Sequence, residues 1–181
     1  YILGSIPFGL VLTKIFLKKD IREIGSGNIG ATNVLRTGKK ILGLGTLFLD
    51  GFKGYTSILI TLSFFPDYVY LSALMCFLGH IFPIWLKFNG GKGIAVYLGI
   101  LCAFSINLGF IFIISWLMVL RFSKYSSLSS LISTLIIFLY SIILNNFNMS
   151  LLFFIIFIIV IYTHRDNISR IRDKTENKTN F

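Results

Sequence analysis

The stretch SLLFFIIFIIVIYT, residues 150–163, contains no charged side chain and decides the fold class. Similar apolar runs recur along the 181 residues, of which 55 % are hydrophobic and 13 % are charged. A soluble domain carries about 25 % charged residues. The runs also lack the polar–apolar alternation of β-barrel strands, so they predict membrane-spanning helices. The sequence therefore indicates an all-α, polytopic integral membrane protein.

Basic residues are unevenly distributed and predict the orientation of the chain. The formal net charge of +10 comes from 17 Lys and Arg against 7 Asp and Glu. In a membrane protein such a charge points to orientation and to anionic lipids or substrates, not to nucleic acid. Positively charged loops stay in the cytoplasm, so we expect the basic clusters inside and the neutral turns outside. The clusters lie at residues 14–40, 87–92, 121–124 and 165–178, and the turns surround Asp67, Ser105 and Asn146.

This partition predicts seven crossings, with the amino end outside and the carboxyl end in the cytoplasm. The run 94–121 has basic loops at both ends and must therefore cross twice. Each arm then has only about 13 residues, or about 20 Å of helix, which is short of a full bilayer. We expect these arms to be tilted, to lie in a thinned region or to be covered by neighbouring helices. The expected spans are residues 1–17, 41–65, 68–86, the two arms of 94–121, 126–145 and 149–163.

The chain shows no internal repeat, so we expect residues 1–181 to form a single membrane-embedded domain. Tyr1 already lies inside an apolar run, and we expect a few native residues to precede it. Cys76 and Cys102 both fall in apolar runs, which favours small core residues over a disulfide or a metal site. The sequence has no metal-ligand cluster and no dinucleotide fingerprint, so we predict neither a metal nor a cofactor.

A polar stretch, REIGSGNIGATNVLR (residues 22–36), interrupts the apolar pattern. Successive backbone N–H groups in a glycine-rich loop before a helix can cradle a phosphate. Arg36 lies one turn beyond Thr32, where a guanidinium can bind the same anion through two N–H groups. The alternative is a flexible cytoplasmic loop. The candidate phosphate-binding residues are Ser26, Gly27, Asn28, Gly30, Thr32, Asn33 and Arg36.

A second segment, KFNGGKGIA (residues 87–95), repeats this composition on the same predicted membrane face. Its spacing matches neither G-x-x-x-x-G-K-[ST] nor G-x-G-x-x-G, so a nucleotide site is not indicated. Two glycine-rich segments on one face favour a phosphate-handling site. The candidates here are Gly90, Gly91, Lys92 and Gly93.

Three polar side chains within the apolar runs have two readings. Asp50 and Lys53, three residues apart in LDGFKG, share a helical face and are either a functional pair or a structural ion pair. His80, in LGHIFP, fits a helix-packing or loop-anchoring donor better than a catalyst. We treat these three as supporting residues.

The last basic segment, THRDNISRIRDK (residues 163–174), follows the final span directly. His164 and Asn167 lie one turn apart at the cytoplasmic edge, where composition alone does not separate a functional role from a flanking one. Arg170, Arg172 and Lys174 fit an ordinary membrane-flanking tail.

Five motifs together resemble the bacterial acyl-phosphate-dependent glycerol-3-phosphate acyltransferases of the inner membrane. The likeness extends from Gly4 to Lys178. The tail reads DKTENK where the family often has a glycine near the glutamate, which leaves only the order of the tail open. In chain order the motifs are GSIPFG, SGNIGATNVLR, LDGFKG, GHIFPIWLKFNGGKGIA and THRDNISRIRDK.

This resemblance implies a seven-helix enzyme whose active site faces the cytoplasm. Its members transfer a fatty acyl group from acyl phosphate to the 1-hydroxyl of sn-glycerol 3-phosphate, giving lysophosphatidic acid and inorganic phosphate, an early step of phospholipid synthesis. The implied partners are these two substrates and membrane lipid, with no protein partner and no nucleic acid. The residues implied to bind the two phosphates and orient the glycerol are Ser26, Thr32, Asn33, Arg36, Lys92, His164 and Asn167.

The chemistry agrees with the residues present. Acyl phosphate is an activated anhydride, so catalysis depends mainly on positioning and charge stabilisation. A substrate phosphate oxygen could accept the hydroxyl proton, assisted by His164. The His-x₄-Asp of acyl-CoA-dependent acyltransferases is absent, because Trp85 and Ser169 stand five residues after His80 and His164. A transporter for a phosphorylated anion is the alternative, but it commonly has inverted repeats and a site near the midplane.

Overall fold

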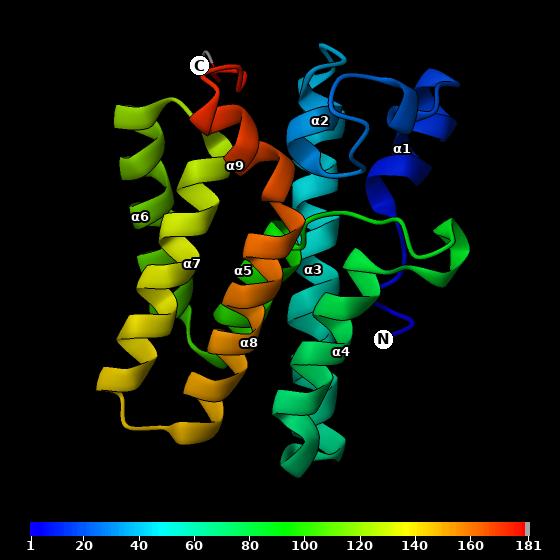
Figure 1. The fold of residues 1–181 in the computed structure, drawn as a ribbon. Helices are drawn as coiled ribbons and strands as arrows, with labels where there is room; N and C mark the ends of the chain where they lie inside the picture. The colour runs from blue at the N-terminus through cyan, green and yellow to red at the C-terminus, as the bar shows by residue number, and fades with distance from the viewer. Residues whose placement is uncertain (180–181) are drawn as a thin grey trace. The chain divides into compact units, whose positions relative to one another are not determined.

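The computed structural model describes residues 1–179, which form helices and connecting turns with no β-strand in that range (Figure 1). Each expected span contains an α-helix, and the run 94–121 contains two, so the all-α prediction is confirmed for these residues. These helices are α1 (Phe8–Leu17), α3 (Lys40–Phe64), α4 (Val69–Ile81), α5 (Ile94–Phe104), α6 (Ile106–Ser123), α7 (Ser126–Ile143) and α8 (Phe147–Thr163). Shorter elements are η1 (Ile21–Glu23), α2 (Ala31–Leu35), η2 (Pro66–Tyr68), η3 (Ile84–Leu86) and α9 (Arg165–Arg172).

By length and composition, three segments are long and apolar enough to cross a membrane: Pro66–Leu86, α6 and α7. A fourth is α8 taken together with α9, which is bent from it by 59°. Helices α1 and α5 are apolar but have only 10 and 11 residues, or about 15 Å of helix each. Seven crossings and the orientation of the two ends therefore stay predictions.

The turn expected near residues 104–107 is present, because α5 ends at Phe104 and α6 begins at Ile106. The Oγ of Ser105 accepts a hydrogen bond from the Asn107 N–H at 3.3 Å and caps α6. The expectation of two arms of about equal length is wrong, since α5 has 11 residues and α6 has 18. Helix α5 starts at Ile94, as expected, and the unequal lengths arise because α6 continues to Ser123.

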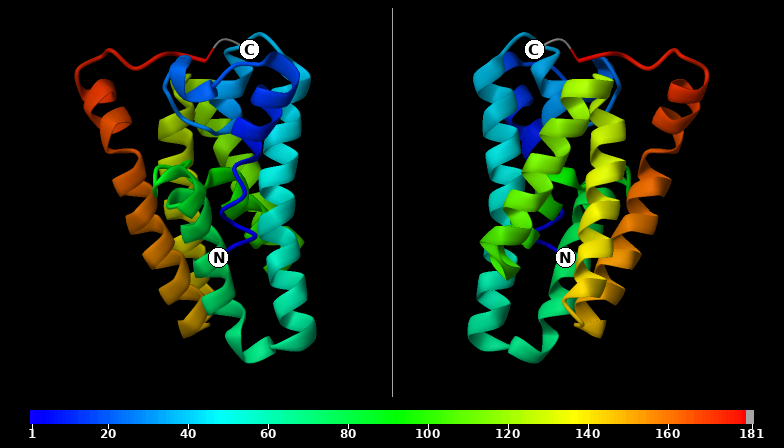
Figure 2. Two further views of the ribbon diagram at one scale, coloured as in Figure 1. Left: turned by 90° about the vertical axis from the view of Figure 1, so that its right-hand side faces the viewer. Right: turned by 90° about the vertical axis from the view of Figure 1, so that its left-hand side faces the viewer.

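Contacts within the chain group into two compact units, Tyr1–Phe104 and Ser105–Phe181, which we describe separately. The prediction of a single domain stays a prediction. In the first unit, α1, α2, α4 and α5 all contact the long helix α3. Helices α3 and α4 run antiparallel and join at η2, as both views of Figure 2 show.

Glycines allow α3 and α5 to cross in backbone contact. A Cβ added at Gly54 would overlap the carbonyl of Val96, and one at Gly99 would overlap the carbonyl of Gly51. Small residues at helix crossings are typical of membrane proteins, where close packing replaces the hydrophobic effect. The crossing fixes the start of α5 against the middle of α3.

The second unit is built on the packing of α7 against α6 and α8. The Nε1–H of Trp116 on α6 donates to Ser130 Oγ on α7 at 3.1 Å. Small hydroxyl side chains on α7 let the neighbouring helices approach closely. Those that are buried are Ser127, Ser129, Ser130, Ser133, Thr134 and Ser141.

The surface is strongly apolar, and the interior includes charged side chains. Large side chains such as Phe122 and Phe147 are 84 % and 78 % exposed, whereas Asp50 and Lys53 are 1 % exposed. An apolar surface and a buried ion pair fit helices surrounded by lipid. Cys76 is buried, as expected of a small core residue, whereas Cys102 is partly exposed.

Candidate functional site

The first glycine-rich segment is organised by the buried side chain of Asn33. Its Nδ2 donates to the backbone oxygens of Ile21, Ile24 and Asn28 at 3.1, 2.8 and 2.8 Å. Its Oδ1 accepts from the Ser26 N–H at 2.9 Å. Both ends of the amide are therefore occupied by the loop. The geometry gives Asn33 the role of a loop organiser, which differs from the phosphate contact expected from the sequence.

Several backbone N–H groups of this segment also bond within it. The bonds run from Ser26 to Asn33 Oδ1, from Gly27 to the Ile24 oxygen at 3.0 Å, and from Gly30 to Asn28 Oδ1 at 2.9 Å. The expectation of amides facing a ligand is therefore wrong for these three N–H groups. Asn28 shows why: its short polar side chain accepts from the backbone N–H two residues ahead, so that N–H is not available to a ligand.

Arg36 passes across Gly25, which has a φ of +58°. A Cβ at Gly25 would lie 3.0 Å from Arg36 Cδ and would overlap Asn33 Oδ1. Arg36, Ser26 and Thr32 are exposed. Arg36 takes part in none of the ion pairs formed within residues 1–179. This loop therefore presents a guanidinium and two hydroxyls to solvent.

An ion pair fixes the chain just before this loop. The Nη2 and Nε of Arg22 lie 2.6 and 2.9 Å from the carboxylate oxygens of Asp20. Hydrogen bonds from Arg22 hold the pKa of Asp20 well below its usual range. Asp20 also accepts from the Arg22 backbone N–H at 3.0 Å, which starts η1. The pair orders the entry to the loop.

The second glycine segment is bound to the end of α4. Pro83 cannot donate to the helix and disfavours helical conformation in the residue before it, so α4 ends and leaves carbonyls without helix partners. The Ile81 and His80 carbonyls accept from Gly90 and Gly91 N–H at 2.9 and 3.0 Å. The prediction that the Gly90 and Gly91 N–H groups face a phosphate is therefore wrong.

Glycine is required in this segment by close packing. A Cβ at Gly91 would overlap the imidazole of His80, and one at Gly93 would overlap the ring of Phe77. Gly93 also has a φ of +83° and its carbonyl accepts the first α5 bond, from Tyr97 N–H at 2.8 Å. Lys92 lies between these two fixed glycines.

Asp50, Lys53 and His80 form one buried cluster. The Nζ of Lys53 lies 2.8 Å from Asp50 Oδ1 and 2.9 Å from His80 Nδ1. It also donates to the Ile6 carbonyl at 2.7 Å and lies 5.6 Å from the Phe8 ring centre. The lysine thereby connects the segment before α1 with α3 and α4. Of the two readings of the Asp50–Lys53 pair, the geometry supports the structural one.

In the second unit, His164 is buried at the end of α8. Its Nδ1 lies 2.9 Å from the Val160 backbone oxygen. A carbonyl only accepts, so Nδ1 carries a proton, and Nε2 is an acceptor when the ring is neutral. The side chain is held in the tautomer that a general base requires.

Glu176 is a residue that the sequence analysis missed. Its carboxylate accepts from Ser127 Oγ, Asn167 Nδ2 and Arg170 Nε at 2.8, 2.6 and 2.7 Å. Burial raises the pKa of Glu176, but these bonds, Arg170 first, outweigh it and the pKa lies below its ordinary value. These bonds hold Glu176 against α7 and α9, and Arg170 is more than a flanking charge. The only sequence signal was an acid within a basic tail.

The predicted residues divide between the two units. The first unit contains both glycine segments, Arg36, Lys92 and the buried charged cluster. The second contains His164 and Asn167. No group of three His, Cys, Asp or Glu side chains suited to a metal occurs in the described chain.

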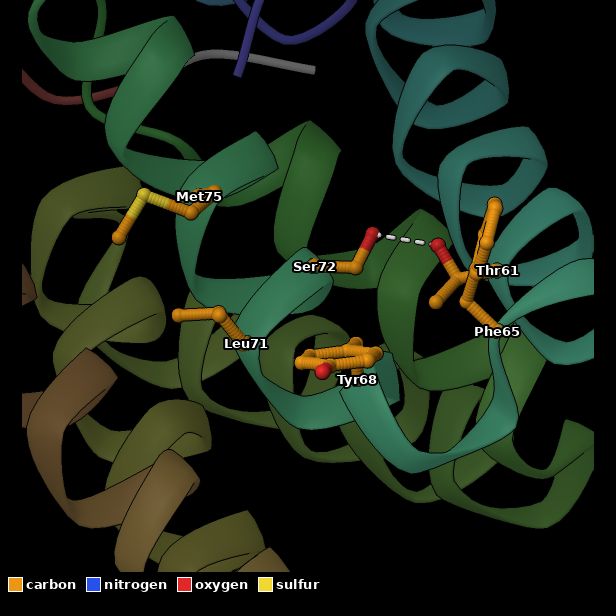
Figure 3. A pocket seen from close by; sticks show the side chains of 6 residues that line it. All are labelled: Thr61, Phe65, Tyr68, Leu71, Ser72 and Met75. Atoms are coloured by element: carbon orange, nitrogen blue, oxygen red, sulfur yellow. Dashed lines mark hydrogen bonds between the residues drawn. The ribbon is translucent and has the colours of Figure 1, made fainter.

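A pocket of about 320 Å³ in the first unit contains none of these residues (Figure 3). It opens beside η2, and the hydroxyls of Thr61 and Ser72 form a 2.7 Å hydrogen bond at its wall. It lies at the opposite end of α3 from α2 and is not a candidate for the polar site. The lining residues are Thr61, Phe65, Tyr68, Leu71, Ser72 and Met75.

Known proteins resemble the chain over nearly its whole length. The family model described as glycerol-3-phosphate acyltransferase matches residues 1–174. A glycerol-3-phosphate acyltransferase of Pelagibacter ubique (strain HTCC1062) is 57 % identical over 179 residues, covering 99 % of this chain and 93 % of the relative. One from Mesorhizobium japonicum (strain LMG 29417 / CECT 9101 / MAFF 303099) is 47 % identical, covering 98 % and 91 %.

Two crystal structures of PlsY (YgiH), an integral membrane glycerol 3-phosphate acyltransferase, are also similar. The glycerol 3-phosphate form has a TM-score of 0.95 at 35 % identity, covering 99 % of this chain and 92 % of that one. The lysophosphatidic acid form has a TM-score of 0.91 at 35 % identity, covering 99 % and 91 %. With matches of this extent in sequence and in structure, the chain belongs to the glycerol-3-phosphate acyltransferase family of integral membrane enzymes.

Proposed function

We propose that this glycerol-3-phosphate acyltransferase uses acyl phosphate as its donor. It transfers the acyl group to the 1-hydroxyl of sn-glycerol 3-phosphate and releases lysophosphatidic acid and inorganic phosphate. The donor is supported by the five motifs that resemble the acyl-phosphate-dependent enzymes. The observation that carries the proposal is the exposed Arg36, beside Ser26 and Thr32 on a loop fixed by Asn33.

This loop suits a phosphate monoester. A guanidinium binds two phosphate oxygens at once, and hydroxyls donate to the remaining ones. Lys92 supplies a second cation from a rigid glycine segment. We propose that these cations bind the phosphate groups of the two substrates and stabilise the charge on the departing phosphate.

The reaction requires one proton to move. The 1-oxygen of glycerol 3-phosphate bonds to the acyl carbonyl carbon, the bond from that carbon to the phosphate oxygen breaks, and the hydroxyl proton leaves. His164 Nε2 is an acceptor in the tautomer that Val160 fixes, and a substrate phosphate oxygen is the other acceptor. We propose that Asn167, one turn on, orients the glycerol.

Two of the solved relatives are described by the ligand form they contain, glycerol 3-phosphate and lysophosphatidic acid. Those two molecules are the acceptor and the product proposed here. The basic loops favour a site on the cytoplasmic face of the bacterial inner membrane. The proposal includes no metal, cofactor or protein partner.

The experiment uses the purified protein in detergent or lipid with labelled glycerol 3-phosphate. Palmitoyl phosphate and palmitoyl-CoA are offered as donors in separate reactions. We expect labelled lysophosphatidic acid from palmitoyl phosphate alone. Equal product from palmitoyl-CoA would contradict the donor assignment, and uptake of label into vesicles without product would favour a transporter.

A further inference from the structure

The imidazole of His80 has a neighbour at each edge. Its Nδ1 lies 2.9 Å from Lys53 Nζ. At its other edge, a Cβ built on Gly91 would overlap Nε2, and the next nearest atoms are also ring atoms of His80. The ring is 4 % exposed. It therefore fills the space between the buried ammonium and the glycine segment that contains Lys92.

The charged cluster determines which nitrogen of His80 carries the proton. An ammonium can only donate, so Nδ1 accepts from Lys53 and the neutral ring has its proton on Nε2. Asp50 Oδ1 lies 2.8 Å from Lys53 Nζ and holds that group in place. The Nε2–H edge is thus fixed against Gly91.

His80 also holds Gly91 through its backbone. The Gly91 N–H donates to the His80 carbonyl at 3.0 Å, and the preceding Gly90 N–H donates to the Ile81 carbonyl at 2.9 Å. Ring and carbonyl of one residue therefore restrain the same glycine. Lys92 follows Gly91 directly in the chain, so the position of its backbone depends on where Gly91 is held.

We propose that His80 is a positioning residue, whose ring, anchored by Lys53, sets the place of Gly91 and thereby of the phosphate-binding Lys92. This inference rests on the proposed function in taking Lys92 as a phosphate ligand. It assigns separate tasks to the two edges of the ring. The Nδ1 edge maintains the buried cluster, and the Nε2 edge determines substrate affinity.

The first test is Gly91→Ala, which leaves His80 and Lys53 unchanged. Gly91 does not have a positive φ, so alanine is strained only by the ring. We expect the KM of glycerol 3-phosphate or of the acyl donor to rise about tenfold or more, because small displacements of a substrate-binding group are costly. The melting temperature should fall as well, because overpacking a buried site is destabilising, so a comparison between two His80 backgrounds isolates the effect on KM.

A double-mutant cycle with His80→Asn isolates the ring contact. Asparagine keeps an acceptor at the Nδ1 position but lacks the Nε2 edge, so it removes the overlap. We expect Gly91→Ala to cause little further loss of substrate affinity in the His80→Asn background. Gly90→Ala is the matched control, because its Cβ would overlap the His80 carbonyl and Pro83. His80→Asn leaves those atoms in place, so the loss of substrate affinity caused by Gly90→Ala should be the same in both His80 backgrounds.

His80→Gln gives the complementary result. Glutamine approximates the Nε2 position but loses the acceptor for Lys53. We expect it to melt below His80→Asn while keeping more of the substrate affinity. If His80 were purely structural, both His80 variants would lower the melting temperature and neither would change KM.

The proposal is overturned if Gly91→Ala leaves both KM values unchanged. It is also overturned if the Gly91→Ala loss is the same within about twofold in both His80 backgrounds, because that is the range in which independent effects add. KM is measured with whichever acyl donor supports turnover. A failure of the acyl-phosphate assignment would therefore appear in the parent protein, not in this comparison.

Discussion

The side-chain oxygen of Asn33 accepts a hydrogen bond from the Ser26 backbone N–H, at 2.9 Å across seven residues. The amide nitrogen of the same side chain faces three carbonyls. Four hydrogen bonds of the loop therefore depend on this one side chain. The position of Ser26, and of Arg36 that follows Asn33 in the chain, depends on it.

Asn33→Asp should destabilise the loop, although the two side chains have the same shape. The nitrogen that donates to three carbonyls becomes an oxygen, and buried carbonyls without donors cost about 1–3 kcal/mol each. We expect a lower melting temperature and a higher KM for a phosphate substrate. Asn28→Asp is the control, because Asn28 only accepts, from Gly30. Equal melting temperatures for both variants would contradict the role given to Asn33.

Arg36→Ala should remove most activity without unfolding the protein. A charge-assisted hydrogen bond to a charged group contributes about 1.5–3 kcal/mol, or roughly ten- to a hundredfold in kcat/KM. Arg36→Lys should recover only part of this, because lysine lacks the two-pronged geometry. Arg172→Ala, at an exposed arginine of α9, is the matched control. Normal kinetics at low substrate for Arg36→Ala would remove Arg36 from the site.

His164→Asn should separate positioning from proton transfer. Asparagine can still donate to the Val160 carbonyl but has no Nε2. We expect a folded protein with a lower kcat and a higher KM for glycerol 3-phosphate, since the group both binds and orients the nucleophile. Size-exclusion profile, melting temperature and steady-state kinetics provide the check. An unchanged kcat would contradict proton transfer to His164 and would assign the hydroxyl proton to a substrate phosphate oxygen.

Glu176 should make the stability of the tail depend on pH. Its pKa is lowered in the folded protein, so its contribution is fully present above the ordinary value of 4.5 and is lost as pH falls through the folded value. At pH 7 we expect Glu176→Gln to melt lower and to be cut faster by trypsin after Arg172 or Lys174. The difference between the two proteins should begin to close below about pH 4.5 and should vanish below the folded pKa of Glu176. A difference that is constant with pH would argue against the carboxylate.

The orientation can be tested by labelling at two turns. Lys124→Cys should react with a membrane-impermeant thiol reagent only after the cytoplasmic face is opened, because basic turns stay inside. Ser105→Cys should react from outside. The native Cys76 is buried and serves as an unreactive reference. Labelling of position 124 from outside would contradict the double crossing between residues 94 and 121.

Local pattern was sufficient to locate the helices. The run 94–121 divides at Ser105, where a capping side chain and a polar turn act locally. Helix ends were harder to predict, since the end of α4 at Ile81 depends on Pro83 and on the bonds that Gly90 and Gly91 make to the last carbonyls of α4. Those contacts are not visible in an apolar run.

The direction of the loop amides could not be read from composition. The sequence of Gly90 and Gly91 is compatible with amides that face a ligand or a helix end, and the carbonyls of His80 and Ile81 decide between them. Glu176 was missed for a related reason. Its partner Ser127 lies 49 residues away, so only the tertiary fold brings them together.

The short helix α5 also bears on how two unlike substrates meet. It packs across α3 at Gly51, which lies 11 residues beyond the first residue of α3, Lys40, or about 16 Å along its axis. The glycine segment that precedes α5 therefore lies beside the middle of α3 and not at its first turn. In the proposed reaction the acyl donor dissolves in the bilayer and glycerol 3-phosphate in water. With the proposed phosphate ligand Lys92 at this depth, the water-soluble substrate would be bound at the level of the acyl donor, so the fatty acid need not be lifted out of the membrane to react.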